Sequence, residues 1–134
     1  MARLILDTGV LVAAARGLLD ESRLAADDDV ALPAVVVAEY LAGVLLDSDP
    51  ARQAAQRAFL TEVLAVTPVC DYDRTVAEHH AVLLAYVQRR GERRGAHDLL
   101  IAATARATGR TLLSTDARAR FSELPDVAAR LIVT

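Results

Sequence analysis

Lysine is missing from this sequence, aromatic residues are scarce and cysteine occurs once. All 15 basic residues are arginine, and aromatic residues make up 4% of the 134 positions. The formal charge of −3 argues against a protein that holds nucleic acid mainly through a broadly positive surface. Because Cys70 has no second cysteine to pair with, an intrachain disulfide and a multi-thiolate metal site are excluded, and we expect a reducing, cytoplasmic location.

Long apolar runs are missing as well. No uninterrupted apolar stretch approaches the roughly 20 residues that a helix needs to cross a bilayer. Residues 4–15 are similar to the apolar part of a secretion signal, but Asp7 interrupts them with a charge. We therefore expect neither a signal peptide nor a segment embedded in a membrane.

What the sequence does contain is typical of one compact domain. Hydrophobic residues make up 54% and charged residues 25%, which argues against disorder. Because aromatic side chains are so few, the interior must be filled by Ala, Val and Leu. We expect a single domain over residues 1–134.

Short apolar runs alternate with longer, helix-like segments along the chain. Strands are predicted at residues 3–6, 30–32, 67–70, 111–114 and 131–133, and helices at 8–16, 20–26, 33–46, 51–65, 73–90 and 97–108. The helices at 33–46 and 51–65 are expected to form a hairpin, and Gly109 to end the last helix. Strands that alternate with helices predict an α/β fold, with a small, mostly parallel β-sheet flanked by helices on both faces.

Four acidic residues lie in segments that otherwise favour burial. Asp7 and Asp116 follow predicted strands, at the edge of the sheet where ligands bind in open α/β folds. Glu39 and Asp98 lie on helices that would pack beside those strands. Each residue also has a structural alternative. Asp7 and Asp98 could cap helices, Asp116 could cap a turn, and Glu39 could pair with a distant arginine.

Taken together, the four carboxylates predict a metal site. Acids within a few ångströms of one another repel and raise one another's pKa values unless divalent cations neutralise them. Carboxylate oxygens suit Mg²⁺ or Mn²⁺. Zinc is not expected, because the adjacent His79 and His80 point to different sides of their helix and no suitably spaced histidine pair occurs.

Four motifs follow one another in order along almost the whole chain. They are LDTGVL at 6–11, Glu39 in a helix after a proline, HDLLIAA at 97–103, and LSTD at 113–116 leading to Phe121. In these motifs the sequence resembles the PIN-domain family, and within it the VapC-type toxins of bacterial toxin–antitoxin pairs. The resemblance implies a PIN-like fold, metal-dependent cleavage of RNA by an endoribonuclease, homodimers, and inhibition by a cognate antitoxin.

The resemblance also implies roles for single residues. One or two Mg²⁺ or Mn²⁺ ions would be bound by four catalytic acids, namely Asp7, Glu39, Asp98 and Asp116. The hydroxyl of Ser114, which replaces the usual threonine, would support the last of these acids. Some relatives carry a further acid just beyond that position, whereas this chain has Arg118 and Arg120, which departs from the family where a second metal would bind.

The densest basic cluster lies just before Asp98 in the sequence. Its members are Arg89, Arg90, Arg93 and Arg94. They are candidates for binding RNA phosphates at the mouth of the acidic site. The alternative is a solvated helix end without a ligand.

Other classes of protein share parts of this pattern. The tripeptide at 7–9, Asp-Thr-Gly, also occurs in aspartic proteases, but those proteins are all-β. A dehalogenase-type phosphatase needs a second acid two residues after the first, where this chain has Gly9. The remaining alternative is a non-catalytic PIN-fold module that binds RNA or an antitoxin and does not cut.

Overall fold

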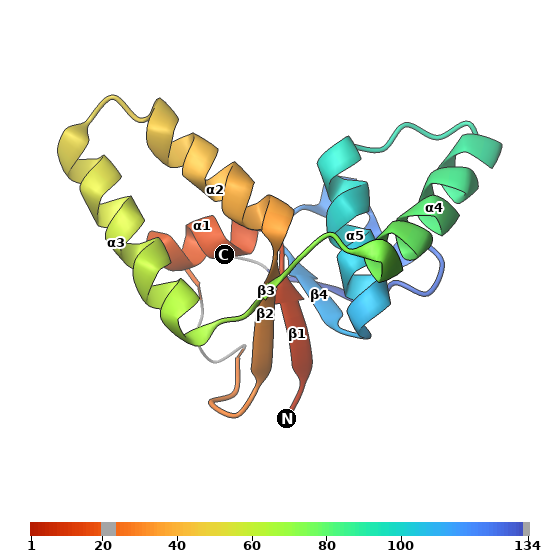
Figure 1. Ribbon diagram of the computed structural model, residues 1–134, viewed down its shortest axis with the longest axis horizontal. Helices are drawn as coiled ribbons and strands as arrows, with labels where there is room; N and C mark the ends of the chain where they lie inside the picture. The colour runs from red at the N-terminus through yellow and green to blue at the C-terminus, as the bar shows by residue number, and fades with distance from the viewer. Residues whose placement is uncertain (20–23, 133–134) are drawn as a thin grey trace.

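The computed structural model describes residues 1–19 and 24–132, and these include a five-stranded parallel sheet (Figure 1). The strands are β1 (Arg3–Leu6), β2 (Asp29–Pro33), β3 (Val69–Cys70), β4 (Thr111–Ser114) and β5 (Ala129–Leu131). Their order across the sheet is β3-β2-β1-β4-β5, and every neighbouring pair is parallel. The prediction of a mostly parallel sheet is confirmed, with β1 at its centre.

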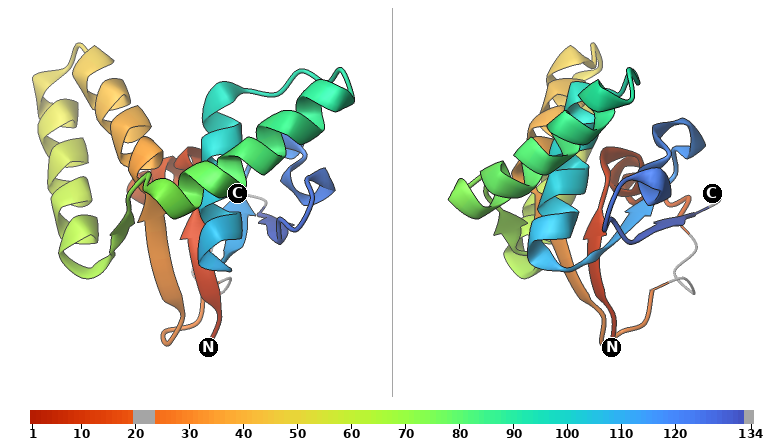
Figure 2. Two further views of the ribbon diagram at one scale, coloured as in Figure 1. Left: turned by 45° about the vertical axis from the view of Figure 1, so that its right-hand side comes forward. Right: turned by 90° about the vertical axis from the view of Figure 1, so that its right-hand side faces the viewer.

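Helices connect these strands. They are α1 (Thr8–Ala15), α2 (Ala34–Leu46), α3 (Pro50–Val66), α4 (Arg74–Arg89) and α5 (Ala96–Thr108). The side views show α1 and the segment after β4 on one face of the sheet, and α4 and α5 on the other (Figure 2). The predicted hairpin of α2 and α3 diverges from the α4–α5 pair (Figure 1). The carboxyl edge of the sheet therefore lies between two helical arms.

Local sequence explains where the helices begin and end. Asp7, Asp49 and Asp73 cap α1, α3 and α4, and each accepts a hydrogen bond from a main-chain N–H in the first turn. Pro50 is the first residue of α3, where an N–H is not needed. Gly109 follows α5 with a φ of 63°, a left-handed conformation that glycine adopts without strain.

The core consists of small and branched side chains, as the composition predicts. Leu4 and Ile5 of β1 are fully buried, and so are Leu112 and Leu113 of β4. Consecutive buried residues are expected of parallel strands that are covered on both faces. Buried alanines of α5 fill the space beside these strands with little bulk. Among the described residues, no helix is both long and apolar enough to span a membrane.

The predicted helix at 20–26 is not found where it can be checked. Residues 20–23 lie outside the described residues, and residues 24–26 are not helical. The Asp28 carboxylate accepts hydrogen bonds from the main-chain N–H groups of Ala2 and Ala25. These bonds favour a turn that leads into β2 in place of a helix.

The last strand lies two residues earlier than predicted, at Ala129–Leu131. Its place is set by pairing with β4, in which Leu112 lies opposite Ala129 and Ser114 opposite Leu131. The sequence pattern could not supply this register, because the segment before it is irregular and contains only two short 3₁₀ helices, η2 (Ala117–Ala119) and η3 (Phe121–Glu123). Residues 133–134 lie outside the described part of the chain.

Candidate active site at the carboxyl edge of the sheet

Asp7 follows β1 directly and is buried, with 5% of its surface exposed. Its main-chain N–H donates to the carbonyl oxygen of Leu113 in β4 at 3.0 Å, which extends the parallel ladder. Its Oδ1 accepts a hydrogen bond from the N–H of Val10 at 3.0 Å. The helix cap considered as an alternative is therefore present, and it also fixes the carboxylate at the carboxyl edge of the sheet.

The surroundings of Asp7 penalise its charged form. Burial raises the pKa of Asp7, because water no longer solvates the carboxylate. Hydrogen bonds from the Ser114 hydroxyl and the Val10 N–H lower this pKa, whereas the negative charge of Asp116 raises it. The net shift is upward, so the protein's own donors do not compensate for the loss of water. A nearby cation would compensate for that loss.

Ser114 and Asp116 lie at the end of β4. Ser114 is buried, and its hydroxyl, which lowers the pKa of Asp7, accepts a hydrogen bond from the Asp116 N–H at 2.9 Å. Asp116 is exposed, and its Oδ1 accepts a hydrogen bond from the N–H of Arg118 at 2.9 Å, which caps η2. One buried hydroxyl therefore joins two of the predicted acids at the ends of neighbouring strands.

Gly9 lies in the first turn of α1, against Thr115. A Cβ atom at position 9 would overlap the Thr115 hydroxyl and would lie 3.6 Å from Oδ1 of Asp7. Glycine is required here for space. Its missing side chain lets the exits of β1 and β4 approach each other, and with them Asp7 and Asp116.

Glu39 reaches the same edge from α2. Its Oε1 accepts a hydrogen bond from the Thr8 hydroxyl at 2.7 Å, and its Oε2 lies 3.1 Å from Nδ1 of His97. The Glu39 side chain is 31% exposed. Glu39 is therefore only partly buried, and its partners come from α1 and α5 and not from its own helix.

Asp98 lies in the first turn of α5, three residues after the N-cap Gly95. A Cβ atom on Gly95 would lie only 2.9 Å from Oδ2 of Asp98, so the carboxylate folds back over the helix end. Burial raises the pKa of Asp98, and the negative charges of the other three acids raise it further, that of Asp116 most. The N-cap of α5 is therefore Gly95 and not Asp98, and the Asp98 carboxylate interacts with the other three acids.

The four predicted acids thus influence one another's charge at one edge of the sheet. Among the described residues, none of Asp7, Asp98 and Asp116 forms an ion pair with an arginine. Their carboxylate oxygens suit a hard divalent cation. Within residues 1–19 and 24–132, however, no three His, Cys, Asp or Glu side chains lie close enough together to hold one ion. Binding would require the carboxylates to move closer.

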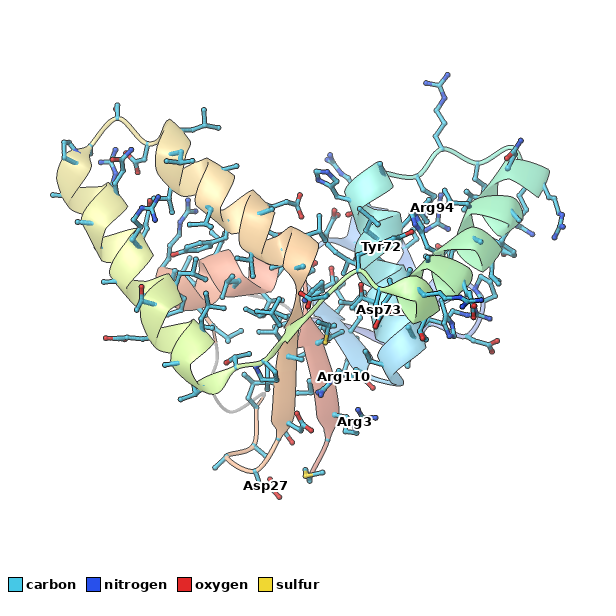
Figure 3. The ribbon with its side chains drawn as sticks, viewed as in Figure 1. Arg3, Asp27, Tyr72, Asp73, Arg94 and Arg110 are labelled. Atoms are coloured by element: carbon cyan, nitrogen blue, oxygen red, sulfur yellow. The ribbon has the colours of Figure 1, made fainter. Side chains whose placement is uncertain are left out.

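The four arginines predicted to bind RNA differ in the structure. Arg89 and Arg93 are exposed. Arg90 lies over the ring of Tyr86, 5.2 Å from its centroid. The side chain of Arg94, labelled in Figure 3, is only 4% exposed. Because its guanidinium is turned inward to protein groups, the expectation that Arg94 faces a phosphate is wrong.

A groove of about 660 Å³ adjoins the acidic edge between α1, α2 and α3. Glu39 lines it together with the apolar side chains of Val12, Tyr40 and Val44, and Arg16 provides an exposed cation. The hydroxyl of Tyr40 donates to a main-chain carbonyl of α3 at 2.9 Å, which ties the hairpin together. The predicted hairpin therefore forms one wall of an accessible groove that charged, polar and apolar side chains line together.

Three residues beside the acids received no role from the sequence. Thr8 follows Asp7, His97 precedes Asp98, and Thr115 lies next to Asp116. Adjacency to a predicted acid was the available signal, but neighbours in a chain point in different directions. Only the fold shows that Thr8 and His97 both contact the carboxylate of Glu39.

The parallel sheet and the acids at its carboxyl edge define an α/β protein whose candidate ligand site lies where the strands end. A family model described as the PIN domain matches residues 4–127. The chain therefore belongs to the PIN-domain family, and the family predicted from its four motifs is confirmed.

Solved structures agree with this assignment. A chain of the FitAcB structure from Neisseria gonorrhoeae is 28% identical with a TM-score of 0.79, covering 94% of this chain and 95% of that one. VapBC-5 from Mycobacterium tuberculosis, a member of the VapBC family of toxin-antitoxin systems, is 28% identical with a TM-score of 0.81, covering 98% and 100%. These structures agree with the resemblance to VapC-type toxins.

A third structure supports the fold alone. VapBC2 from Rickettsia felis, bound to a DNA fragment from its promoter, has a TM-score of 0.85 at 22% identity and covers 98% of this chain and 99% of that one. A comparison with curated protein sequences gives no significant match.

Proposed function

We propose that this protein is a metal-dependent endoribonuclease, and the toxin of a VapBC-type toxin–antitoxin pair. The observation that carries the proposal is the position of Asp7, Glu39, Asp98 and Asp116 at one edge of the sheet, where burial and like charges raise the pKa values of Asp7 and Asp98. Acids with perturbed pKa values in such a position are typical of functional sites. Membership of the PIN-domain family supports hydrolysis of a nucleic acid.

The metal would be Mg²⁺ or Mn²⁺, and its ligands would be Asp7, Glu39, Asp98 and Asp116. When bound, such a cation supplies a water activated for attack and neutralises charge on the phosphate. Other residues orient these ligands. Ser114 lowers the pKa of Asp7 and accepts a hydrogen bond from the Asp116 N–H, and Thr8 donates a hydrogen bond to Glu39. No nucleophilic side chain is required.

The exposed Arg89 and Arg93, with Arg90 beside them, would bind RNA phosphates. Changing Arg89 and Arg93 together to Gln should weaken RNA binding several-fold and make it less sensitive to salt, because fewer counterions are then released. Filter binding across a salt series measures both effects, and Mn²⁺ affinity serves as the control. A double variant with an unchanged salt dependence would remove these arginines from the interface.

The proposed protein partner is a cognate antitoxin, since VapBC-5 belongs to a family of toxin-antitoxin systems. A peptide segment of the antitoxin would bind in the groove beside Glu39, which charged, polar and apolar side chains line together. A segment in this groove would lie against the acidic edge and exclude RNA. We also propose a homodimer on the resemblance alone, and light scattering of the purified chain tests it.

A non-catalytic module that binds RNA or an antitoxin is the second candidate. The observation in its favour is that, over the described residues, no three potential ligand side chains lie within reach of a single ion. A module of this kind would bind RNA equally well with and without divalent cations.

Incubation of total RNA with the purified, antitoxin-free protein separates the two candidates. The nuclease should produce discrete fragments with Mg²⁺ or Mn²⁺, no fragments with EDTA, and fragments again when Mn²⁺ is added in excess. Asp7→Asn is the matched variant, because Asn caps a helix as well as Asp does. Absence of cleavage by a folded wild-type protein in Mn²⁺ would favour the binding module.

A further inference from the structure

Arg94 is a buried cation that the proposed chemistry does not use. Its Nη1 donates to the carbonyl oxygen of Ala119 at 2.6 Å and to that of Arg120 at 3.0 Å. Its Nε and Nη2 each lie 3.2 Å from Oε2 of Glu92. A buried guanidinium is tolerated only when its donors are paired, so this position is shaped for a planar fork of donors.

Glu92, the anion in this contact, is fixed to the end of α4. Its main-chain N–H donates to the carbonyl oxygen of Val87 at 3.0 Å, and its Oε1 accepts a hydrogen bond from Nε of Arg90 at 2.8 Å. The arginines, Arg90 first, hold the pKa of Glu92 below its usual range. Arg94 is therefore attached to a charged group that is itself held in place.

The other side of the contact is the turn that Asp116 begins. Asp116 caps η2, Ala119 is the last residue of η2, and Arg120 follows with a left-handed φ of 48°. A residue with a side chain is strained in this conformation. The two carbonyl groups that Arg94 holds lie on either side of the Arg120 α-carbon, so the guanidinium braces the strained residue.

We infer that Arg94 is a positioning residue for the acidic centre, because it ties the segment before Asp98 to the turn that Asp116 begins. Asp98 follows Arg94 by four positions on the same stretch of chain. Asp98 and Asp116 are both carboxylates, so the two segments carry like charges that push them apart. The hydrogen bonds of Arg94 hold these two acids at their observed spacing against that repulsion. Its role toward a metal rests on the proposed function.

Lysine at position 94 would keep the positive charge and lose the fork, because one ammonium group replaces three separate donor nitrogens. The variants Arg94→Lys and Arg94→Gln should therefore behave alike if geometry is the contribution of Arg94. If charge alone mattered, the lysine variant would retain wild-type behaviour, and the inference would be overturned.

Mn²⁺ affinity, measured by calorimetry on the full chain, tests the role toward the metal. Both Arg94 variants should bind Mn²⁺ about 10-fold more weakly, as expected when groups behind the ligands are disturbed. The matched control is Arg106→Gln. Arg106 is also largely buried, at 15% exposed, and its Nε donates to the Pro125 carbonyl oxygen at 3.1 Å, at the opposite end of α5. That variant should lose thermal stability and keep Mn²⁺ affinity.

Hydrogen exchange of the metal-free protein gives a second readout that does not depend on the proposed function. Amides of residues 117–121 should exchange faster in both Arg94 variants than in Arg106→Gln. A wild type that binds no Mn²⁺ would refute the proposed function, and the exchange rates would still decide whether the tie exists. Unchanged exchange at 117–121, or unchanged Mn²⁺ affinity beside a wild type that binds, overturns the inference. If neither variant folds, Glu92→Gln replaces them, with a smaller effect in the same direction.

Discussion

The two edges of the same parallel sheet both carry acidic residues, but the pKa values of these acids are shifted in opposite directions. At the amino edge, hydrogen bonds from the N–H groups of Ala2 and Ala25 hold the pKa of Asp28 below its usual range. At the carboxyl edge, burial and like charges hold the pKa values of Asp7 and Asp98 above theirs. The first arrangement stabilises the fold, and the second destabilises it.

Arginine completes this contrast. Arg110, labelled near the amino ends of β1 and β2 in Figure 3, donates through Nη1 to Oδ1 of Asp29 at 3.0 Å. The same nitrogen reaches the carbonyl oxygens of Asp29 and Leu4 at 2.9 and 3.2 Å. Near the carboxyl edge, Arg94 bonds instead to main-chain carbonyls and to Glu92. At the amino edge Arg110 pairs with an acid. Near the carboxyl edge Arg94 instead holds the main chain in place.

The difference separates acids that contribute to the stability of the fold from acids whose charge the fold leaves uncompensated. Acids that the protein needs for stability receive hydrogen bonds or a cation from the chain itself. Acids that remain repelled and partly desolvated in the folded protein reduce its stability, and such a cost is typical of a functional site.

Exchanging one acid at each edge should separate function from stability. Asp7→Asn should abolish RNA cleavage, because the proposed metal loses a charged ligand, and should leave the unfolding midpoint unchanged or higher, because a penalised charge is removed. Asp28→Asn should leave cleavage intact and lower the midpoint. Gel assays of RNA and thermal unfolding measure the two effects. Wild-type turnover by Asp7→Asn would contradict the assignment.

Closing the space at Gly9 should damage the carboxyl edge selectively. Gly9→Ala should lower the free energy of unfolding by about 1–3 kcal/mol, because the new methyl group overlaps the Thr115 hydroxyl. Cleavage should fall with it, since Asp7 and Asp116 are pushed apart. Adding Thr115→Ala should restore most of the stability, because the remaining Cβ lies 3.5 Å away. Urea unfolding of the four proteins of this cycle measures the coupling, and additive effects would disprove the contact.

Removing the cation of the amino edge should affect stability alone. Arg110→Met should lower the free energy of unfolding by about 1–2 kcal/mol, because the carbonyl oxygens of Leu4 and Asp29 lose their donor. RNA cleavage per folded molecule should not change. A variant that unfolds like the wild type would mean that this edge is held by the ladder bonds of the sheet alone.

The pH dependence of stability should have opposite signs at the two edges. Asp7 and Asp98 have raised pKa values, so their contribution to the stability of the metal-free protein is full below the ordinary value of 3.8 and is lost as the pH rises through the raised values. Asp28 has a lowered pKa, so its contribution is full above 3.8 and is lost as the pH falls through the lowered value.

Urea unfolding between pH 3 and pH 7 tests this statement. The double variant Asp7→Asn and Asp98→Asn should remove a loss of stability that occurs as the pH rises above about 4. Asp28→Asn should instead remove a loss of stability that occurs as the pH falls below about 4. Identical profiles for the wild type and the double variant would show that the acids at the carboxyl edge are not penalised by folding.

Local patterns in the sequence were sufficient for most of the secondary structure. The apolar runs of β1 and β4 are short, buried and bounded by polar residues, and α3 and α4 begin directly after Asp49 and Asp73. The last strand was misplaced because its register depends on β4, a partner that lies earlier in the chain. The predicted helix at 20–26 is absent over 24–26, where the main-chain N–H of Ala25 donates to the Asp28 carboxylate and favours a turn.

The sequence by itself determined the four acids as candidates, because each interrupts an apolar segment at a strand exit or on a neighbouring helix. It could not determine their partners, since Glu39 meets Thr8 and His97 across 31 and 58 positions of chain. Nor could it separate Arg94 from its exposed neighbours, because charge and spacing are the same for a solvated arginine and a buried one. Patterns a few residues long fix the strands, the helices and the chemical types. Contacts over long sequence distances, which decide burial and therefore pKa, arise only when the sheet has formed.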